Sequence, residues 1–198
     1  MKIGIIGSGG IGQAFAKQVL KAGYEVIISN SRGADSLSEI VKQLHGNGKA
    51  GLVEEAVACD VIFLAVPWIH LPTVAKQIPN WTNKIVIDPI NPVVPPDYKI
   101  AELNGRASSE VVQEMLAGVK LVKAFNTFTP QLLGSSPEEA NGKRVLFYCG
   151  DDASAKAIVK IMIDKIGFAG VDTGTLKDGA LLQQYPSGPL PGLNLIKL

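Results

Sequence analysis

The sequence predicts a single doubly wound α/β domain with a mostly parallel β-sheet. Apolar runs of about five residues, rich in valine and isoleucine, alternate with longer amphipathic stretches, and glycine or proline flanks most of these runs. Buried parallel strands have this composition, and the stretches between them form helices that cover both faces of the sheet. The length of 198 residues fits one compact domain.

The same pattern locates each expected element along the chain. Strands are expected near residues 2–7, 25–29, 60–66, 84–88, 119–124, 144–149 and 168–173, with a weaker strand at 50–53. Helices are expected over residues 10–22, 34–44, 68–77, 108–117 and 152–166. We expect residues 1–184 to form the domain and residues 185–198 to form a C-terminal tail.

Composition and charge give no reason to expect a nucleic-acid or membrane partner. The formal net charge is +1, and acidic and basic residues are mixed along the chain. Glycines interrupt the first apolar residues, and no apolar run approaches the roughly 20 residues that a membrane-spanning helix needs. The two cysteines, Cys59 and Cys149, each adjoin an apolar run and are expected to be reduced thiols of a cytoplasmic protein.

A glycine-rich motif of the form G-x-G-x-x-G directly follows the first predicted strand. A helix comes next, and a second strand follows at the distance that completes a βαβ unit. In dinucleotide-binding Rossmann domains, the first glycine makes a tight turn and the second lets the backbone approach the pyrophosphate, while the third lets helix and strand pack closely. The phosphates bind to free amides at the helix N-terminus. The predicted pyrophosphate site comprises Gly7, Ser8, Gly9, Gly10, Ile11 and Gly12.

The end of the second predicted strand indicates which dinucleotide binds. Domains that prefer NAD place an acidic residue there, which binds the ribose 2′-hydroxyl. This chain has Asn30, Ser31 and Arg32 instead, and the first acid that follows is Asp35. An arginine offers a planar set of donors to a 2′-phosphate, and asparagine and serine add neutral ones. We therefore predict NADP(H) as the cofactor, with a solvated arginine in a polar turn as the alternative interpretation.

Two further strand ends carry candidate binding residues, because ligands of doubly wound sheets bind outside the carboxyl ends of the strands. Val66, Pro67 and His70 lie at or just beyond the end of the strand at 60–66. His70 either faces the nicotinamide or the second substrate, or lies on the surface; it is the one candidate for a catalytic side chain, and no catalytic residue is assigned. Asn126, after the strand at 119–124, either binds a carboxamide or caps its own loop.

Several kinds of site are missing from the sequence. It contains no nucleophile with an adjacent base, no cluster of histidine and cysteine that could bind a metal, no P-loop and no Tyr-x-x-x-Lys.

The proline-rich segment 91–99 follows a strand and is expected to be a loop at the carboxyl edge of the sheet. About 25 residues follow the last predicted strand, too few for a helical substrate domain. We therefore expect a small-molecule redox acceptor to lie directly on the cofactor, as suits hydride transfer between two stacked rings.

Taken together, the segments GIIGSGGIG, SNSRG, AVPWIH, KAFNT and CGDD resemble the NADPH-dependent coenzyme F420 reductase family over residues 1 to about 175. Members of this family have a Rossmann fold and move hydride between NADP(H) and the 5-deazaflavin coenzyme F420. The fold also resembles the cytosolic domain of the six-transmembrane metalloreductases, in which NADPH reduces a flavin. The resemblance implies that the pyrophosphate binds to Ser8–Ile11 and the 2′-phosphate to Ser31 and Arg32. It also implies that the nicotinamide lies between two groups of residues, Val66, Pro67 and His70 on one side and Ala124–Asn126 on the other.

The sequence departs from this family at its C-terminus. The deazaflavin reductases close their pocket with an apolar C-terminal helix, whereas residues 183–198 here are shorter and rich in proline and glycine. The predicted function is therefore an NADPH-dependent oxidoreductase whose acceptor is coenzyme F420 or a flavin, FMN or FAD. The alternative is a non-catalytic NADP(H)-binding protein that senses redox state or binds a partner. Aliphatic side chains in the tail predict that it packs on the domain or on the second subunit of a homodimer.

Overall fold

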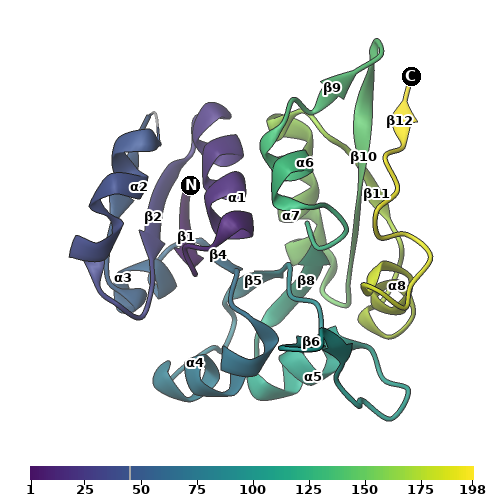
Figure 1. Cartoon of the computed structure of the whole chain (residues 1–198), viewed down its shortest axis with the longest axis horizontal. Helices are drawn as coiled ribbons and strands as arrows, with labels where there is room; N and C mark the ends of the chain where they lie inside the picture. The colour runs from purple at the N-terminus through teal and green to yellow at the C-terminus, as the bar shows by residue number, and fades with distance from the viewer. Residues whose placement is uncertain (45) are drawn as a thin grey trace.

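The structure is a computed structural model that describes residues 1–44 and 46–198, and it confirms the α/β architecture with a mostly parallel central sheet (Figure 1). Six parallel strands form its main part, in the spatial order β3 (Gly48–Ala50), β2 (Glu25–Ser29), β1 (Lys2–Ile6), β4 (Val61–Leu64), β5 (Ile85–Asp88) and β8 (Lys120–Ala124). Beyond β8, strand β10 (Gly142–Gly150) runs antiparallel, and β11 (Ala169–Asp172) pairs parallel with β10. The six parallel strands therefore all end at one edge of the sheet.

Helices cover both faces of the sheet because successive strand residues point to opposite sides. In β1, for example, Ile5 belongs to one buried cluster and Ile6 to the other. The face of Ile5 is covered by α1 (Gly10–Lys21), α2 (Ser38–Gln43), α6 (Pro130–Gly134) and α7 (Ala153–Ile166). The face of Ile6 is covered by α3 (Val53–Val57), α4 (Leu71–Gln77), α5 (Ser108–Met115) and α8 (Leu176–Gln183).

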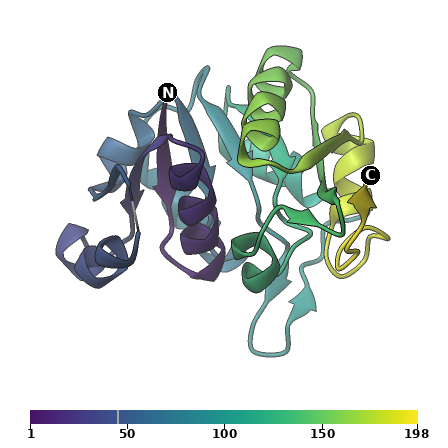
Figure 2. The same ribbon diagram turned by 90° about the horizontal axis from the view of Figure 1, so that it is seen from above.

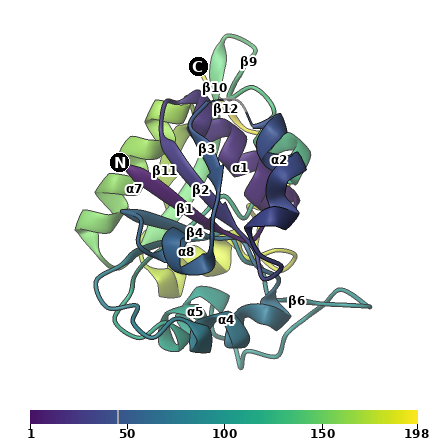
Figure 3. The same cartoon turned by 90° about the vertical axis from the view of Figure 1, so that its left-hand side faces the viewer.

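Some predicted elements differ from the observed ones. The helix predicted over 34–44 is a 3-10 turn, Ala34–Leu37, followed by the short helix α2, and the helix predicted over 68–77 starts with another 3-10 turn, Trp68–His70. The helices α3, α6 and α8 were not predicted. The predicted loop at 91–99 contains a two-stranded hairpin, β6 (Val93–Val94) and β7 (Lys99–Ile100), which projects from the body in Figures 2 and 3.

No helix in the described part of the chain is long and apolar enough to cross a membrane.

The C-terminal tail runs back along the domain, beside β10 (Figure 1). The Gly192 amide donates to the Thr127 carbonyl at 3.1 Å, and the Val145 amide donates to the Leu195 carbonyl at 2.8 Å. Strand β12 (Ile196–Lys197) then pairs antiparallel with the beginning of β10, on the opposite side of β10 from the short strand β9 (Glu138–Glu139). The tail is therefore tied to the sheet by backbone hydrogen bonds and by Leu190, which packs against Val145, Phe147 and Ala169. Its other leucines, Leu193, Leu195 and Leu198, are exposed.

Candidate functional site

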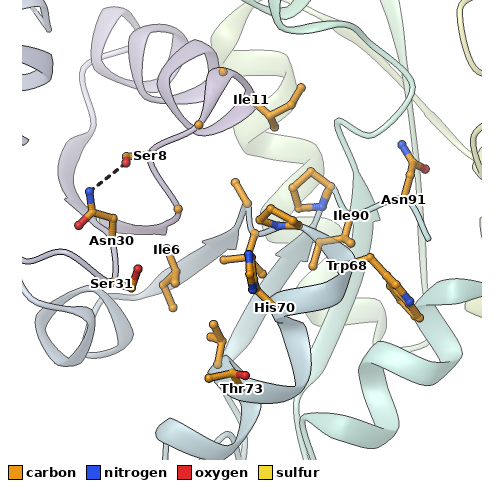
Figure 4. Close-up of a pocket in the computed structure, with 18 of the residues that line it drawn as sticks. Ile6, Ser8, Ile11, Asn30, Ser31, Trp68, His70, Thr73, Ile90 and Asn91 are labelled. Carbon is orange, nitrogen blue, oxygen red and sulfur yellow. Dashed lines mark hydrogen bonds between the residues drawn. The ribbon is translucent and has the colours of Figure 1, made fainter. Parts of the chain in front are cut away.

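A cavity of about 940 Å³ opens at the carboxyl ends of β1, β2, β4 and β5 (Figure 4). This volume falls within the range of pockets that bind cofactors and small molecules. Arg32 is the one side chain with a permanent charge among its described lining residues, which include no aspartate or glutamate. Eleven predicted site residues line the cavity: Gly7, Ser8, Gly9, Gly10, Ile11, Asn30, Ser31, Arg32, Val66, Pro67 and His70.

The three glycines of the G-x-G-x-x-G motif have different surroundings. Gly7 has a φ of +108°, and a Cβ atom there would lie 2.1 Å from the Ala65 carbonyl oxygen. At Gly12, a Cβ atom would lie 2.1 Å from the Gly7 carbonyl oxygen, so this residue permits close packing of α1 on the loop. At Gly9, by contrast, a Cβ atom would meet no protein atom within 4 Å. Gly7 and Gly12 are therefore required by the fold, whereas the space above Gly9 belongs to the cavity.

The N-terminus of α1 offers unpaired amides to this space. Gly9 is the N-cap residue and provides no side-chain hydrogen bond to the first turn. The amides of a first helical turn have no intrahelical acceptor, and the helix dipole favours a negative charge beside them. Side chains hold the loop in place: Gln13 donates to the Ser8 carbonyl at 2.7 Å, and Asn30 Nδ2 donates to Ser8 Oγ at 3.1 Å. The loop is thus an anion-binding cradle fixed from behind and open toward the cavity.

The turn after β2 presents Ser31 and Arg32 at the rim of the cavity. Asn30 shapes this turn, because its Oδ1 accepts the Arg32 amide at 2.8 Å and its Nδ2 donates to Ser36 Oγ at 3.0 Å. Ser31 and Arg32 are both exposed. None of the ion pairs found among residues 1–44 and 46–198 involves Arg32. The guanidinium is therefore available to an anionic ligand.

The other end of the cavity is largely apolar, and most of it was not predicted. We call it the apolar end; it comprises Trp68, Pro89, Ile90, Asn91, Val93, Pro95 and Tyr98. Figure 4 shows Trp68, Ile90 and Asn91 on the side away from Ser8, Asn30 and Ser31, with His70 between the two groups. The sequence placed the loop 91–99 at this edge without assigning it to the site. The signal that could have identified these residues is the strand-then-loop sequence DPINP, at the same edge as the glycine motif.

Ala124 and Asn126 do not line the cavity, although the family resemblance placed them opposite the nicotinamide. Ala124 is fully buried in the core on the face of α1. Asn126 lies behind Asn91, which does line the cavity: its Nδ2 donates to Asn91 Oδ1 at 3.1 Å, and its carbonyl accepts from Asn91 Nδ2 at 2.9 Å. Asn126 therefore supports the wall from the second layer.

Six other lining residues also escaped prediction: Ile6 at the end of β1, Ala65 just after β4, Val53 at the start of α3, and Thr73, Val74 and Gln77 on α4. Neither cysteine belongs to the cavity, and both are free thiols. Burial raises the pKa of the Cys149 thiol to about 12, so it is protonated at neutral pH and is not a nucleophile. No group of three or more histidine, cysteine, aspartate or glutamate residues among those described is arranged to hold a metal ion.

Comparison with known proteins shows which families and structures this chain resembles. Residues 2–92 match the family model described as NADP oxidoreductase, coenzyme F420-dependent. The rat (Rattus norvegicus) metalloreductase STEAP3 is 28% identical over 191 residues, which cover 96% of this chain and 37% of the rat protein. This chain thus spans about a third of the length of the curated relatives it matches.

Two solved structures are similar over most of the chain. The protein SMa0349 from Sinorhizobium meliloti is 39% identical, with a TM-score of 0.94, and the match covers 100% of this chain and 97% of that one. A protein from Arthrobacter sp. FB24, assigned as an F420-dependent NADP reductase, has the same fold at 22% identity, with a TM-score of 0.75 and coverage of 89% and 86%. Residues 2–92 of this chain, a little under half of its length, are thus similar to the coenzyme F420-dependent NADP oxidoreductase family.

Proposed function

We propose that this protein is an NADP(H)-dependent oxidoreductase that transfers hydride to a planar ring acceptor bound at the apolar end. The observation that carries this proposal is the open space above Gly9, in front of the uncapped first turn of α1. The space lies where the pyrophosphate binds in a Rossmann domain, at the N-terminus of the helix that follows the first strand. The family match supports NADP-dependent redox chemistry in the same part of the chain.

The charge distribution of the cavity supports one orientation of the dinucleotide, with its 2′-phosphate at Arg32 and its nicotinamide toward the apolar end. Ser31 and Arg32 would bind the 2′-phosphate, because Arg32 is the one permanent charge among the described lining residues. The pyrophosphate would then bind the amides of Ser8–Ile11, and the nicotinamide would lie beyond Pro67, toward Ile90 and Asn91. NADPH supplies the hydride in this arrangement. The protein's own contribution is to bind and orient the two reactants and to exclude water.

The apolar end supports a flat, uncharged ring as the hydride acceptor. Two prolines, Pro89 and Pro95, contribute no backbone amide there, and Trp68 and Tyr98 offer aromatic surface for stacking. No described lining residue at this end carries a charge, so a phosphate or carboxylate tail on the acceptor would extend into solvent. The ring of coenzyme F420 or of a flavin meets these requirements.

An acceptor screen tests this function. Oxidation of NADPH should be measured with coenzyme F420, FMN, FAD, riboflavin, a quinone and a ferric chelate. We expect turnover with a deazaflavin or flavin, and none with the chelate unless a flavin is added. If the protein binds NADPH but oxidises it with none of the ring acceptors, it is instead a binding protein without catalytic activity.

Substitution of His70 tests whether a side chain takes part in proton transfer. His70 lines the cavity at the N-terminus of α4 and is exposed. Hydride transfer between two rings needs no proton from a side chain, so His70→Ala should lower kcat by less than about a hundredfold, the low end of what an acid–base catalyst contributes. Thr73→Ala, one turn along α4, is the matched control. A loss of roughly ten-thousandfold at saturating substrates, in a folded variant, would instead make His70 an essential acid or base.

A further inference from the structure

A fully buried ion pair lies directly beneath the apolar end. The side chains of Asp88 and Lys123 are both 0% exposed, and Lys123 Nζ lies 3.2 Å from Asp88 Oδ2. They stand opposite one another at the ends of the parallel strands β5 and β8. Removing two charges from water is costly, and apolar pairs of similar volume often stabilise a protein as well or better. Stability of the core therefore does not explain this pair.

Both side chains of the pair form hydrogen bonds to the backbone of one cavity-lining residue, Ile90. Asp88 Oδ1 accepts the Ile90 amide at 2.8 Å, and Lys123 Nζ donates to the Ile90 carbonyl. Two serines of α5 complete the network: Ser109 Oγ donates to Asp88 Oδ2 at 2.7 Å, and Ser108 Oγ lies 3.4 Å from Lys123 Nζ. Both backbone polar groups of Ile90 are thus bound by side chains from β5 and β8.

The neighbouring residues of this turn are fixed as well. Asn91 exchanges two hydrogen bonds with Asn126, and its Oδ1 also accepts the Tyr185 amide at 3.1 Å. Pro89 has no amide to satisfy and a restricted φ. The position of Ile90 and Asn91 against the cavity therefore depends on side-chain hydrogen bonds rather than on strand pairing.

We propose that Asp88 and Lys123 are positioning residues that set where the turn 89–91 meets the nicotinamide. This inference rests on the proposed binding of NADP(H) but not on the identity of the acceptor. Small displacements of a reacting ring cost large factors in rate, so a rigid turn at this place has a catalytic purpose that a stable core does not require.

The test compares two ligands that differ at the nicotinamide half. NADP⁺ occupies the whole dinucleotide site, whereas adenosine 2′,5′-bisphosphate lacks the nicotinamide. The double variant Asp88→Asn/Lys123→Met removes both charges with little change in volume and leaves no unpaired buried ion. We expect its Kd for NADP⁺ to rise roughly tenfold and its Kd for the bisphosphate to change by less than about twofold. The kcat with a ring acceptor should fall more than the KM for NADPH rises.

Two further variants keep the comparison decisive. Arg144→Met is the matched control, because it removes a buried cation that pairs with Glu139 at the far end of β10 and should leave the ratio of the two Kd values unchanged. If the double variant does not fold, Ser109→Ala takes its place in the test. It removes one hydrogen bond to Asp88 and should give the same selective effect, smaller in size. Equal losses for both ligands, or no loss for either, in a folded variant would refute the assignment. A wild-type protein that binds NADP⁺ but oxidises NADPH with no acceptor would refute the proposed activity and leave the positioning test intact.

Discussion

Replacing Gly9 with valine is expected to lower the affinity for NADPH by at least about a hundredfold while leaving the fold intact. The backbone of Gly9 has φ −72° and ψ −176°, which any residue can adopt, and a Cβ atom there would meet no protein atom within 4 Å. The branched side chain would occupy the space of the pyrophosphate and separate it from the amides of α1. Each charge-assisted hydrogen bond that is lost contributes about 1.5–3 kcal/mol, so losing two corresponds to a hundredfold or more.

Isothermal titration with NADPH, together with a thermal melt, measures both parts of this expectation. Gly12→Ala is the contrasting control, because its Cβ would lie 2.1 Å from the Gly7 carbonyl oxygen and should lower the melting temperature directly. A Gly9→Val variant that binds NADPH normally would show that the pyrophosphate does not lie on this loop. One that fails to fold would show that the space above Gly9 is not free.

Replacing Arg32 with alanine is expected to remove most of the preference for NADPH over NADH. The guanidinium is exposed and forms no ion pair in the described part of the chain, so its removal leaves no buried charge behind. The lost charge-assisted bonds to the 2′-phosphate should weaken NADPH binding by about 1.5–3 kcal/mol, or roughly 10- to 150-fold. Binding of NADH, which lacks this phosphate, should not change.

Titration of both nucleotides against wild type and variant measures the preference. Arg106→Ala is the control for loss of a positive charge, because Arg106 pairs with Glu114 and does not line the cavity. The same effect in that variant would indicate general electrostatic attraction rather than a contact at Arg32. An unchanged preference in Arg32→Ala would mean that other residues recognise the phosphate, or that none does.

The sequence was most informative for features that depend on residues close together in the chain. The βαβ unit, the glycine motif and the turn after β2 all follow from short-range periodicity and from the steric needs of Gly7 and Gly12, so the polar end of the cavity could be predicted residue by residue. The short helices α3, α6 and α8 could not. They have between five and eight residues and form through contact with the sheet rather than through a long periodic pattern.

The position of Asn126 behind the cavity could not be predicted, because it depends on an unusual backbone turn after β8. Phe125 is buried and has a φ of +66°, a left-handed conformation that is rare for a large aromatic residue. This turn points Asn126 toward Asn91, in the layer behind the cavity, so the residues after β5 line the wall instead. The antiparallel direction of β10 relative to β8 could not be predicted either, because an apolar run has the same composition in a parallel and in an antiparallel strand.

The central claim is direct transfer of hydride from NADPH to a ring held at the apolar end. It is tested most directly with NADPH that carries deuterium at the transferable position of C4 and with coenzyme F420, since a deazaflavin retains the transferred hydrogen on carbon. We expect mass spectrometry to find the deuterium in the reduced deazaflavin, from one C4 face of the nicotinamide, and Gly9→Val to abolish the transfer. Deuterium that appears in water, or NADPH that binds and is never oxidised by any ring acceptor, would contradict this account.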